Sequence, residues 1–228
     1  MSFDLHSPSD PLIYLITSGQ TNARTTPETK DFSSIIQLVQ AAVATRIDLV
    51  QIREKNLSAN VLYQLATSAA GITKESDTKL LINDRSDIAA AAGAAGVHLT
   101  TSSLPTSVVR QTFGDEFLIG VSTHSLAEAS LASKSGADFV VFGPVFETTS
   151  KRENGEAVGL TKLAGVCAKL SPFPVLALGG VRSGNACDCI RAGARGVAAI
   201  SMLQEPDRLA DIADAIRRSF ADKWGPSE

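Results

Sequence analysis

The chain has 228 residues, of which 44% are hydrophobic and 20% are charged, and its formal net charge is −3. A domain of this length hides roughly 70% of its unfolded surface, so it needs no disulfide or metal to stabilise its core. The weak negative charge and the absence of long lysine or arginine runs exclude the basic surface that nucleic acids and membrane surfaces require. No apolar stretch reaches the roughly 18 residues of a membrane span.

The cysteines and the N-terminal residues bear on the compartment and the domain organisation. Cys167, Cys187 and Cys189 are odd in number and irregularly spaced, which argues against a disulfide framework and against a tetrahedral zinc site. Residues 1–11 lack the pattern of a secretory signal. We therefore expect a cytoplasmic protein with reduced thiols and a single domain over residues 1–228, of which 1–11 form a flexible N-terminal tail. The sequence leaves the oligomeric state open, and a homo-oligomer is compatible with it.

Short apolar runs alternate with longer amphipathic stretches along the chain. The runs are rich in valine, isoleucine and leucine, as is typical of parallel strands that are covered on both faces. They predict strands at Leu12–Thr17, Ile47–Ile52, Lys79–Ile82, Gly96–Leu99, Leu118–Val121, Asp138–Phe142, Pro174–Leu178 and Gly196–Ile200. Apolar residues at helical spacing predict helices that include Ser33–Thr45, Ser58–Gly71, Leu126–Ser135, Leu160–Leu170 and Pro206–Lys223. Eight such units in about 210 residues favour a closed (β/α)₈ TIM barrel over an open doubly wound sheet, which usually has fewer strands.

In such a barrel the active-site residues lie at the carboxyl ends of the strands. After the second predicted strand the chain reads Gln51-Ile52-Arg53-Glu54-Lys55, and Gln51 and Arg53 share a face because side chains alternate along a strand. Arg53 and Lys55 suit a diphosphate, since a guanidinium is a planar fork of donors and an ammonium a compact charge. The competing interpretation is a surface ion pair of Arg53 or Lys55 with Glu54.

Three further strand ends carry an amide, a carboxylate and two histidines. Asn83 and Asp84 follow the third strand, and a carboxylate there can hold Mg²⁺ together with substrate phosphates. Alternatively, Asp84 caps the helix that begins near Ser86. His98 and His124 lie at the ends of the fourth and fifth strands. A lone histidine near a core is more often structural, but neutral imidazoles at a barrel mouth can both donate and accept protons.

The longest connection, Gly143–Gly159, follows the sixth strand. Connections of this length are uncommon in compact domains and are often functional lids. Thr148, Ser150 and Lys151 supply two hydroxyls and a cation, which suits the binding of a phosphate. The competing interpretation is a mobile, charged surface loop.

The last two strand ends predict a second phosphate pocket. Gly179 and Gly180 follow the seventh strand, and Ile200 and Ser201 end the eighth. In this fold the loops after strands seven and eight commonly bind phosphate through exposed backbone amides. Paired glycines permit the close backbone approach that side chains would block. A glycine pair that serves packing alone is the alternative.

Taken together, the segments resemble the superfamily of thiamine-phosphate synthases and thiazole tautomerases. The similar segments run in order along nearly the whole barrel: QIREK (Gln51–Lys55), INDR (Ile82–Arg85), GVHL (Gly96–Leu99), GVSTHS (Gly120–Ser125), GADFVVFGPVFETTSK (Gly136–Lys151), LALGGV (Leu176–Val181) and GARGVAAIS (Gly193–Ser201). The resemblance to the synthases implies the coupling of hydroxymethylpyrimidine diphosphate to thiazole phosphate with release of diphosphate. It implies Mg²⁺ as cofactor and small phosphorylated molecules as the partners of the site.

The resemblance also implies roles for individual residues. Contacts to the pyrimidine diphosphate fall on Gln51, Arg53, Lys55, Asn83, Ser122 and Lys151. Contacts to the thiazole phosphate fall on Thr148, Ser150, Gly180, Ile200 and Ser201, and we add His98 and Gly179 to the predicted substrate contacts. Asp84 matches one magnesium ligand. The second magnesium carboxylate of the synthases is missing, because Ser103 stands in its place, and this weakens the expected metal site.

Two alternatives follow from this departure. The tautomerase branch isomerises a thiazole phosphate without metal, and its acid/base histidine corresponds to His124. Asp84, His98 and Ser150 favour the synthase, because a proton transfer needs no magnesium carboxylate. A non-catalytic barrel that binds a phosphorylated ligand and regulates a partner is the second alternative. Arg53, Lys55 and Lys151 argue against it.

Overall fold

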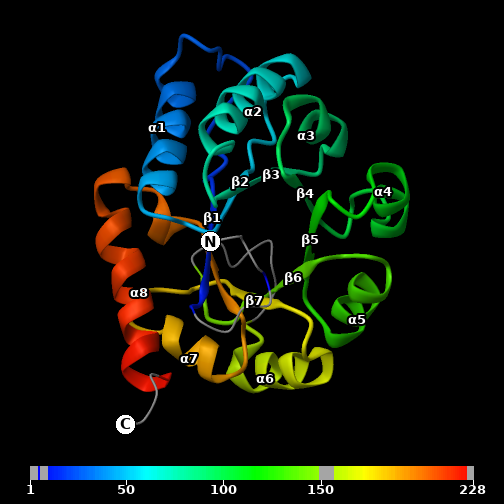
Figure 1. Ribbon diagram of the computed structural model, residues 1–228, viewed down its shortest axis with the longest axis vertical. Helices are drawn as coiled ribbons and strands as arrows, with labels where there is room; N and C mark the ends of the chain where they lie inside the picture. Colours follow the sequence, from blue (N-terminus) through cyan, green and yellow to red (C-terminus); the bar gives the residue numbers. More distant parts are fainter. Residues whose placement is uncertain (1–4, 6–9, 149–156, 225–228) are drawn as a thin grey trace.

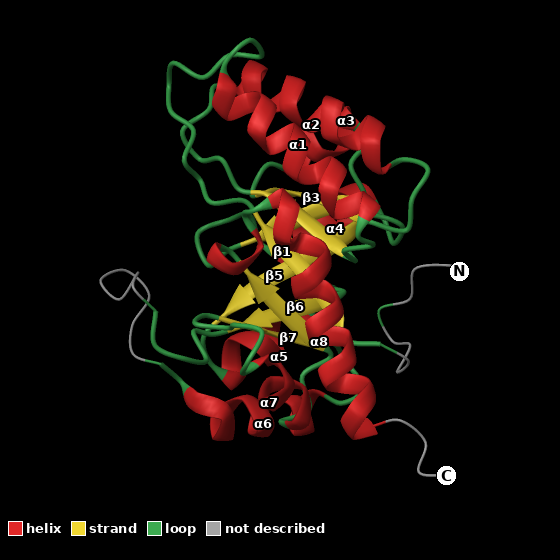
Figure 2. Ribbon diagram, turned by 90° about the vertical axis from the view of Figure 1, so that its left-hand side faces the viewer, coloured by secondary structure: helices red, strands yellow, loops and turns green. Residues whose placement is uncertain are grey.

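Eight parallel strands close into a barrel in sequence order, from β1 to β8 and back to β1. The computed structural model describes Leu5, residues 10–148 and residues 157–224, with side chains as far as residue 220. Helices form the outer layer around the strands (Figure 1), and the side view shows the sheet enclosed between them (Figure 2). The prediction of a TIM barrel is confirmed.

The strands are short and almost entirely buried, as their apolar sequences predict. They are β1 (Leu12–Ile16), β2 (Leu49–Ile52), β3 (Lys79–Asn83), β4 (Gly96–Leu99), β5 (Leu118–Thr123), β6 (Phe139–Phe142), β7 (Val175–Leu178) and β8 (Gly196–Ala199). The helices are α1 (Lys30–Ala44), α2 (Ala59–Thr73), α3 (Ser86–Ala92), α4 (Thr106–Phe113), α5 (Leu126–Lys134), α6 (Gly159–Leu170), α7 (Ala186–Arg191) and α8 (Leu209–Trp224). Two 3₁₀ turns, η1 (Ser201–Leu203) and η2 (Pro206–Arg208), precede α8.

Side-chain alternation divides the core into two layers. Residues that point outward from the strands pack against the helices and form the larger hydrophobic cluster. Residues that point inward fill the barrel, and Tyr14 and Phe139 are the largest of these. Parallel pairing sets the register, for example Ile16 beside Gln51 and Asn83 beside His98. The buried polar residues Gln51 and His98 are in these pairs, so the otherwise apolar interior becomes polar toward the carboxyl ends of the strands.

The element boundaries differ from the sequence prediction by a few residues, each for a local reason. β2 begins at Leu49 because the amide of Ile47 bonds back to Ala42 of α1. β3 and β5 extend through Asn83 and Thr123, so the polar residues predicted to follow these strands begin inside them. The last helix begins at Leu209 instead of Pro206, since the proline starts a separate 3₁₀ turn.

Leu5 lies in the inner core at the amino end of the barrel, and the other N-terminal residues described are Asp10 and Pro11. The side chain of Arg195 donates to the carbonyl of Leu5 at 2.8 Å and also bonds the carbonyl of Asp10. The three cysteines are free, and Cys167 and Cys189 are buried. Among residues 10–148 and 157–224, no helix has the length and apolar character to cross a membrane.

Candidate active site at the carboxyl end of the barrel

The strand-two motif divides its side chains between the barrel and the neighbouring loop. Gln51 lies in the barrel interior and is 1% exposed. The carboxylate of Glu54 is buried and accepts hydrogen bonds from the amides of Gly19 and Thr21 and from the Thr21 hydroxyl, at 3.1, 3.2 and 2.7 Å. The amide of Arg53 donates to Thr17. β2 therefore holds the β1–α1 loop, residues 17–29, against the mouth of the barrel.

The two cations of this motif remain unpaired within the described part of the chain. Neither Arg53 nor Lys55 forms an ion pair there, so the competing interpretation of a pair with Glu54 is wrong. The Arg53 guanidinium lies beside Gly19, where an added Cβ would be 3.5 Å from Nη1. Its charge also acts on His98 inside the barrel. Arg53 is half-buried and Lys55 is exposed, so both are positioned to meet an anion.

Asp84 follows β3 with an exposed side chain and a positive φ of 64°. It does not cap α3, because the N-cap position is Arg85 and has no side-chain cap bond. Arg85 pairs instead with Asp87 at 2.6 Å. Within the described residues no hydrogen bond or ion pair involves the Asp84 carboxylate, which leaves it available for a cation or a substrate.

Ser103 occupies the position where a second magnesium carboxylate was expected. Its hydroxyl oxygen accepts from the amide of Thr100 at 2.8 Å and lies 3.1 Å from the Thr100 hydroxyl. Within the described residues no cluster of three or more histidine, cysteine or acidic side chains could hold a metal. The donor set fits a magnesium ion with one protein carboxylate, the remaining ligands being phosphate oxygens and water.

Ser122 and His98 belong to a hydrogen-bonded line inside the barrel. His98 contacts the Tyr14 hydroxyl through Nδ1 at 3.2 Å and the Ser122 hydroxyl through Nε2 at 2.9 Å. Burial, together with the charge of Arg53, lowers the pKa of His98 from 6.5 to about 3, so the ring is neutral near pH 7. His98 is 2% exposed and reaches the mouth through Ser122.

His124 lies on the rim, at the start of the β5–α5 connection. Its Nδ1 is 2.6 Å from the carbonyl oxygen of Gly143, and its amide donates to Glu128 at 2.7 Å. A carbonyl oxygen only accepts, so Nδ1 carries a proton and Nε2 is the free position of the neutral ring. The side chain is exposed. It can therefore offer Nε2 to a ligand as a hydrogen-bond acceptor or a base.

The two ends of the long β6–α6 connection are held together. The amide of Val158 donates to Pro144 at 2.8 Å and that of Gly159 to Val145 at 3.0 Å. Thr148 is half-buried next to this base. The other two predicted phosphate contacts of the connection, Ser150 and Lys151, lie outside the described residues.

The glycine pair after β7 serves close packing and also leaves amides free. Gly179 and Gly180 have φ values of 96° and 65°, which L side chains rarely adopt. A Cβ on Gly179 would lie 2.4 Å from Pro144, and one on Gly180 would lie 2.6 Å from the carbonyl of Glu147. Neither glycine amide donates to any described residue. Close packing therefore accounts for the absence of side chains here, while the free amides retain the predicted capacity for phosphate.

The end of β8 contributes further free amides. Ile200 precedes the 3₁₀ turn η1, and the exposed Ser201 is its first residue. The first amides of such a turn have no partner within it. The amide group of Gln204 bonds the carbonyls of Ile16 and Ile200 at 2.9 and 2.8 Å, which fixes this corner. Together with the β7 turn, it forms the place where this fold commonly binds phosphate.

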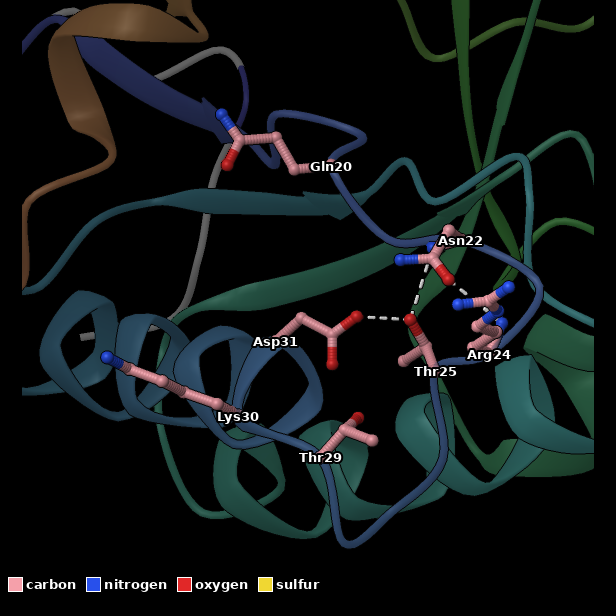
Figure 3. A pocket seen from close by; sticks show the side chains of 7 residues that line it. All are labelled: Gln20, Asn22, Arg24, Thr25, Thr29, Lys30 and Asp31. Carbon is pink, nitrogen blue, oxygen red and sulfur yellow. Dashed lines mark hydrogen bonds between the residues drawn. The ribbon is translucent and has the colours of Figure 1, made fainter.

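A hollow of about 410 Å³ lies between the β1–α1 loop and the first residues of α1 (Figure 3). In Figure 3 the Asp31 carboxylate points toward Thr25, whose hydroxyl donates to it, while Thr25 also accepts from the amide of Asn22 at 3.1 Å. These groups satisfy one another, and their hydrogen bonds stabilise the loop. The sequence analysis missed this loop, because its polar residues follow no motif. The anchoring residues Thr17 and Thr21 could be found only from the register with Arg53 and Glu54.

Cations at β2, a carboxylate at β3 and amides at β7 and β8 lie at one end of the barrel, because all the strands are parallel, and the carboxylate and amides have no partner among the described residues. This fold and site define a (β/α)₈ barrel enzyme that acts on phosphorylated small molecules. The chain belongs to the thiamine monophosphate synthase family, whose model matches residues 13–203.

Individual relatives agree with this assignment. A thiamine-phosphate synthase from Haloarcula marismortui is 36% identical over 90% of this chain and 94% of its own length. One from Ruminiclostridium cellulolyticum is 35% identical over 96% of this chain and all of its own. The structure of a thiamine phosphate pyrophosphorylase from Pyrococcus furiosus superimposes with a TM-score of 0.77 at 26% identity, covering 97% of this chain and 100% of that one.

Proposed function

We propose that the protein is a thiamine-phosphate synthase, a single-domain cytoplasmic transferase. It couples hydroxymethylpyrimidine diphosphate to thiazole phosphate in thiamine biosynthesis. The observation that carries this proposal is the pairing of two anion-binding regions at one mouth. Within the described part of the chain, Arg53 and Lys55 at β2 form no ion pair, and the amides of Gly179 and Gly180 after β7 have no acceptor. Two regions of this kind match two separate phosphorylated substrates.

The reaction is a substitution at the exocyclic carbon of the pyrimidine. The bond between this carbon and the diphosphate oxygen breaks, and the oxygen leaves with the bonding electrons. The lone pair of the thiazole nitrogen then forms the new carbon–nitrogen bond. No proton has to move, so the protein acts by orienting the substrates and by stabilising the charge of the leaving group.

The residues at the mouth divide this work between them. Arg53 and Lys55 bind the diphosphate and stabilise its growing negative charge. Thr148, Gly180 and Ser201 hold the thiazole phosphate, with Ser150 and Lys151 completing the two contact sets. Asp84 would hold Mg²⁺, which would supply further positive charge at the leaving group.

The direct test is to incubate the purified protein with both substrates over a magnesium titration and to follow thiamine phosphate. We expect product that depends on both substrates and on the metal. Replacing Ser103 by aspartate restores a carboxylate that can still accept from the Thr100 amide, and we expect a lower Mg²⁺ concentration at half-maximal rate. An unchanged magnesium dependence in Ser103→Asp argues against a metal at this position.

His124 supports one alternative, the metal-independent thiazole tautomerase. Its Nδ1 proton is held by Gly143, which leaves Nε2 free as a base at the mouth. This alternative predicts isomerisation of the carboxythiazole phosphate that is lost in His124→Ala and unaffected by chelators. Isomerisation without any coupling at any magnesium concentration would replace the synthase proposal. Binding of thiazole phosphate without turnover of either kind would support the regulatory alternative.

A further inference from the structure

Four polar side chains form a continuous line of hydrogen bonds through the barrel. Gln51 Nε2 donates to the hydroxyl oxygen of Tyr14 at 2.9 Å, and this oxygen lies 3.2 Å from Nδ1 of His98. Nε2 of His98 lies 2.9 Å from Oγ of Ser122. The first three residues are at most 2% exposed. Ser122 lies two residues beyond Gly120, the register partner of His98, and so lies nearer the mouth.

Packing holds the His98 ring in one orientation. Its centroid lies 5.7 Å from the Tyr14 ring and 6.2 Å from the Phe139 ring. Gly120 provides the space beside it, since a Cβ there would lie 2.8 Å from Nδ1 of His98 and 2.4 Å from Phe139. A ring turned over would place carbon atoms against the Tyr14 and Ser122 hydroxyls, so the two hydrogen bonds keep each ring nitrogen with its partner.

The direction of donation along this line follows from the protons that each group has. An amide nitrogen only donates, so the Tyr14 oxygen accepts from Gln51. Among the described residues Nδ1 of His98 is the one acceptor that the buried Tyr14 hydroxyl contacts, so its proton points at Nδ1. Because Nδ1 accepts this proton, the one proton of the neutral ring is on Nε2. Nε2 therefore donates to Ser122. The hydroxyl proton of Ser122 is left free to point toward the mouth.

We propose that Tyr14 and His98 are positioning residues that hold the Ser122 hydroxyl as a hydrogen-bond donor to the substrate. A hydroxyl oriented in this way matches an acceptor atom, such as an unprotonated ring nitrogen or a phosphate oxygen. It matches a substrate amino group poorly. The inference rests on the proposed function for the identity of that substrate, the pyrimidine diphosphate.

The tautomer of His98 gives a test that needs no substrate. The chain has three histidines, so ¹⁵N chemical shifts of the ring nitrogens can be assigned by comparison with a His98→Gln variant. We expect the Nε2-protonated neutral form throughout the range from about pH 5 to about pH 8. A proton on Nδ1 would reverse the line, make Ser122 donate into the barrel, and overturn the proposal. The variant serves only to assign the signals, and the tautomer itself is read from the wild-type protein.

Substrate kinetics test the role of Tyr14. Tyr14→Phe keeps the ring and removes the hydroxyl, and we expect kcat/KM for the pyrimidine diphosphate to fall about tenfold, the effect of one hydrogen bond. The KM for thiazole phosphate should stay unchanged. Tyr63→Phe is the matched control, because Tyr63 is the only other tyrosine and is 41% exposed on α2. Equal kinetics in Tyr14→Phe and wild type contradict the proposal.

A double-mutant cycle separates action through Ser122 from a general structural effect. If Tyr14 works by orienting the serine hydroxyl, Tyr14→Phe should cause little further loss in a Ser122→Ala background. If the losses in kcat/KM of the two single variants multiply in the double variant, Tyr14 acts independently of Ser122, and this contradicts the proposal. Wild-type protein without coupling activity would refute the proposed function, while the ¹⁵N shifts would still decide the tautomer.

Discussion

The Glu54 carboxylate accepts a hydrogen bond of 2.7 Å from the Thr21 hydroxyl, although its sequence neighbours, Arg53 and Lys55, are both cations. Strand alternation explains this choice, since Gln51 and Arg53 share one face of β2 and Glu54 takes the other. The carboxylate therefore holds the β1–α1 loop and does not neutralise the two cations. The positive charge that Arg53 and Lys55 offer to an anion at the mouth depends on Glu54 binding the loop instead.

Replacing Glu54 by glutamine should loosen the β1–α1 loop. The new amide group places a donor against the Thr21 and Gly19 donors, so at least one buried donor loses its acceptor. We expect a loss of about 1–3 kcal/mol in the free energy of unfolding, seen as a Tm lower by several degrees. Glu28→Gln is the control, because Glu28 lies at the exposed end of the same loop. Equal Tm values for the two variants would contradict the role of Glu54.

Replacing Asp84 by asparagine should lower the affinity of the active site for magnesium. Asparagine tolerates the positive φ at this position, so the backbone should be unaffected while the anionic ligand is lost. We expect the Mg²⁺ concentration for half-maximal coupling to rise by about tenfold or more. Asp87→Asn provides the control on the same surface, since Asp87 pairs with Arg85. An equal rise in this Mg²⁺ concentration in both variants would indicate an effect of general surface charge and would contradict the role of Asp84 as a metal ligand.

The sequence predicted the barrel well because its strands are buried on both faces and therefore read as continuous apolar runs. β4, Gly96–Leu99, was predicted to the residue. The starts of β2 and of the last helix were missed because local structure decides them, such as the hydrogen bond from Ile47 back to α1 and the 3₁₀ turn at Pro206. These features depend on the folded geometry and leave no mark in composition or periodicity.

The site was predictable where polar residues interrupt an apolar strand end, as at Gln51, Arg53 and Asp84. Tyr14 was missed because a tyrosine within Leu-Ile-Tyr-Leu-Ile is typical of core packing. Its partners Gln51 and His98 come from strands β2 and β4, so the contact appears only once the barrel register is known. Strand parity indicates that a side chain points inward, but not which hydroxyl meets which nitrogen.

Replacing Gly180 by alanine should displace the start of the β6–α6 connection. The added Cβ would lie 2.6 Å from the carbonyl of Glu147 and 2.7 Å from Cβ of Phe146, on a backbone with φ of 65°. We expect a rise of at least about tenfold in the KM for thiazole phosphate, because an error of about 1 Å in a binding loop costs this much or more. Gly184→Ala is the matched control, since its added Cβ would meet nothing within 4 Å. A KM in Gly180→Ala that matches the control would remove the β7 turn from the phosphate site.

His98 should make the stability of the protein depend on pH in mildly acidic solution. Burial and the nearby charge of Arg53 lower its pKa from 6.5 to about 3 in the folded chain. The unfolded chain therefore takes up a proton below about pH 6.5 that the folded chain refuses, so the free energy of unfolding falls as the pH decreases through this window. Above it the group contributes no pH dependence. The slope from this one side chain is at most about 1.4 kcal/mol per pH unit.

Urea unfolding midpoints between about pH 4.5 and about pH 7.5 can isolate this contribution. His98→Gln should lose stability at neutral pH, because the glutamine cannot reproduce both ring contacts, yet it should lose less than wild type on acidification. His124→Gln is the control, since it removes an exposed histidine from the rim. A difference between wild type and His98→Gln that stays constant with pH would mean that the folded ring takes up its proton at the same pH as the unfolded chain, against the low pKa of His98. A difference that grows in favour of wild type on acidification would mean that the buried ring is already protonated, and the assignment of a neutral imidazole between Tyr14 and Ser122 would then be wrong.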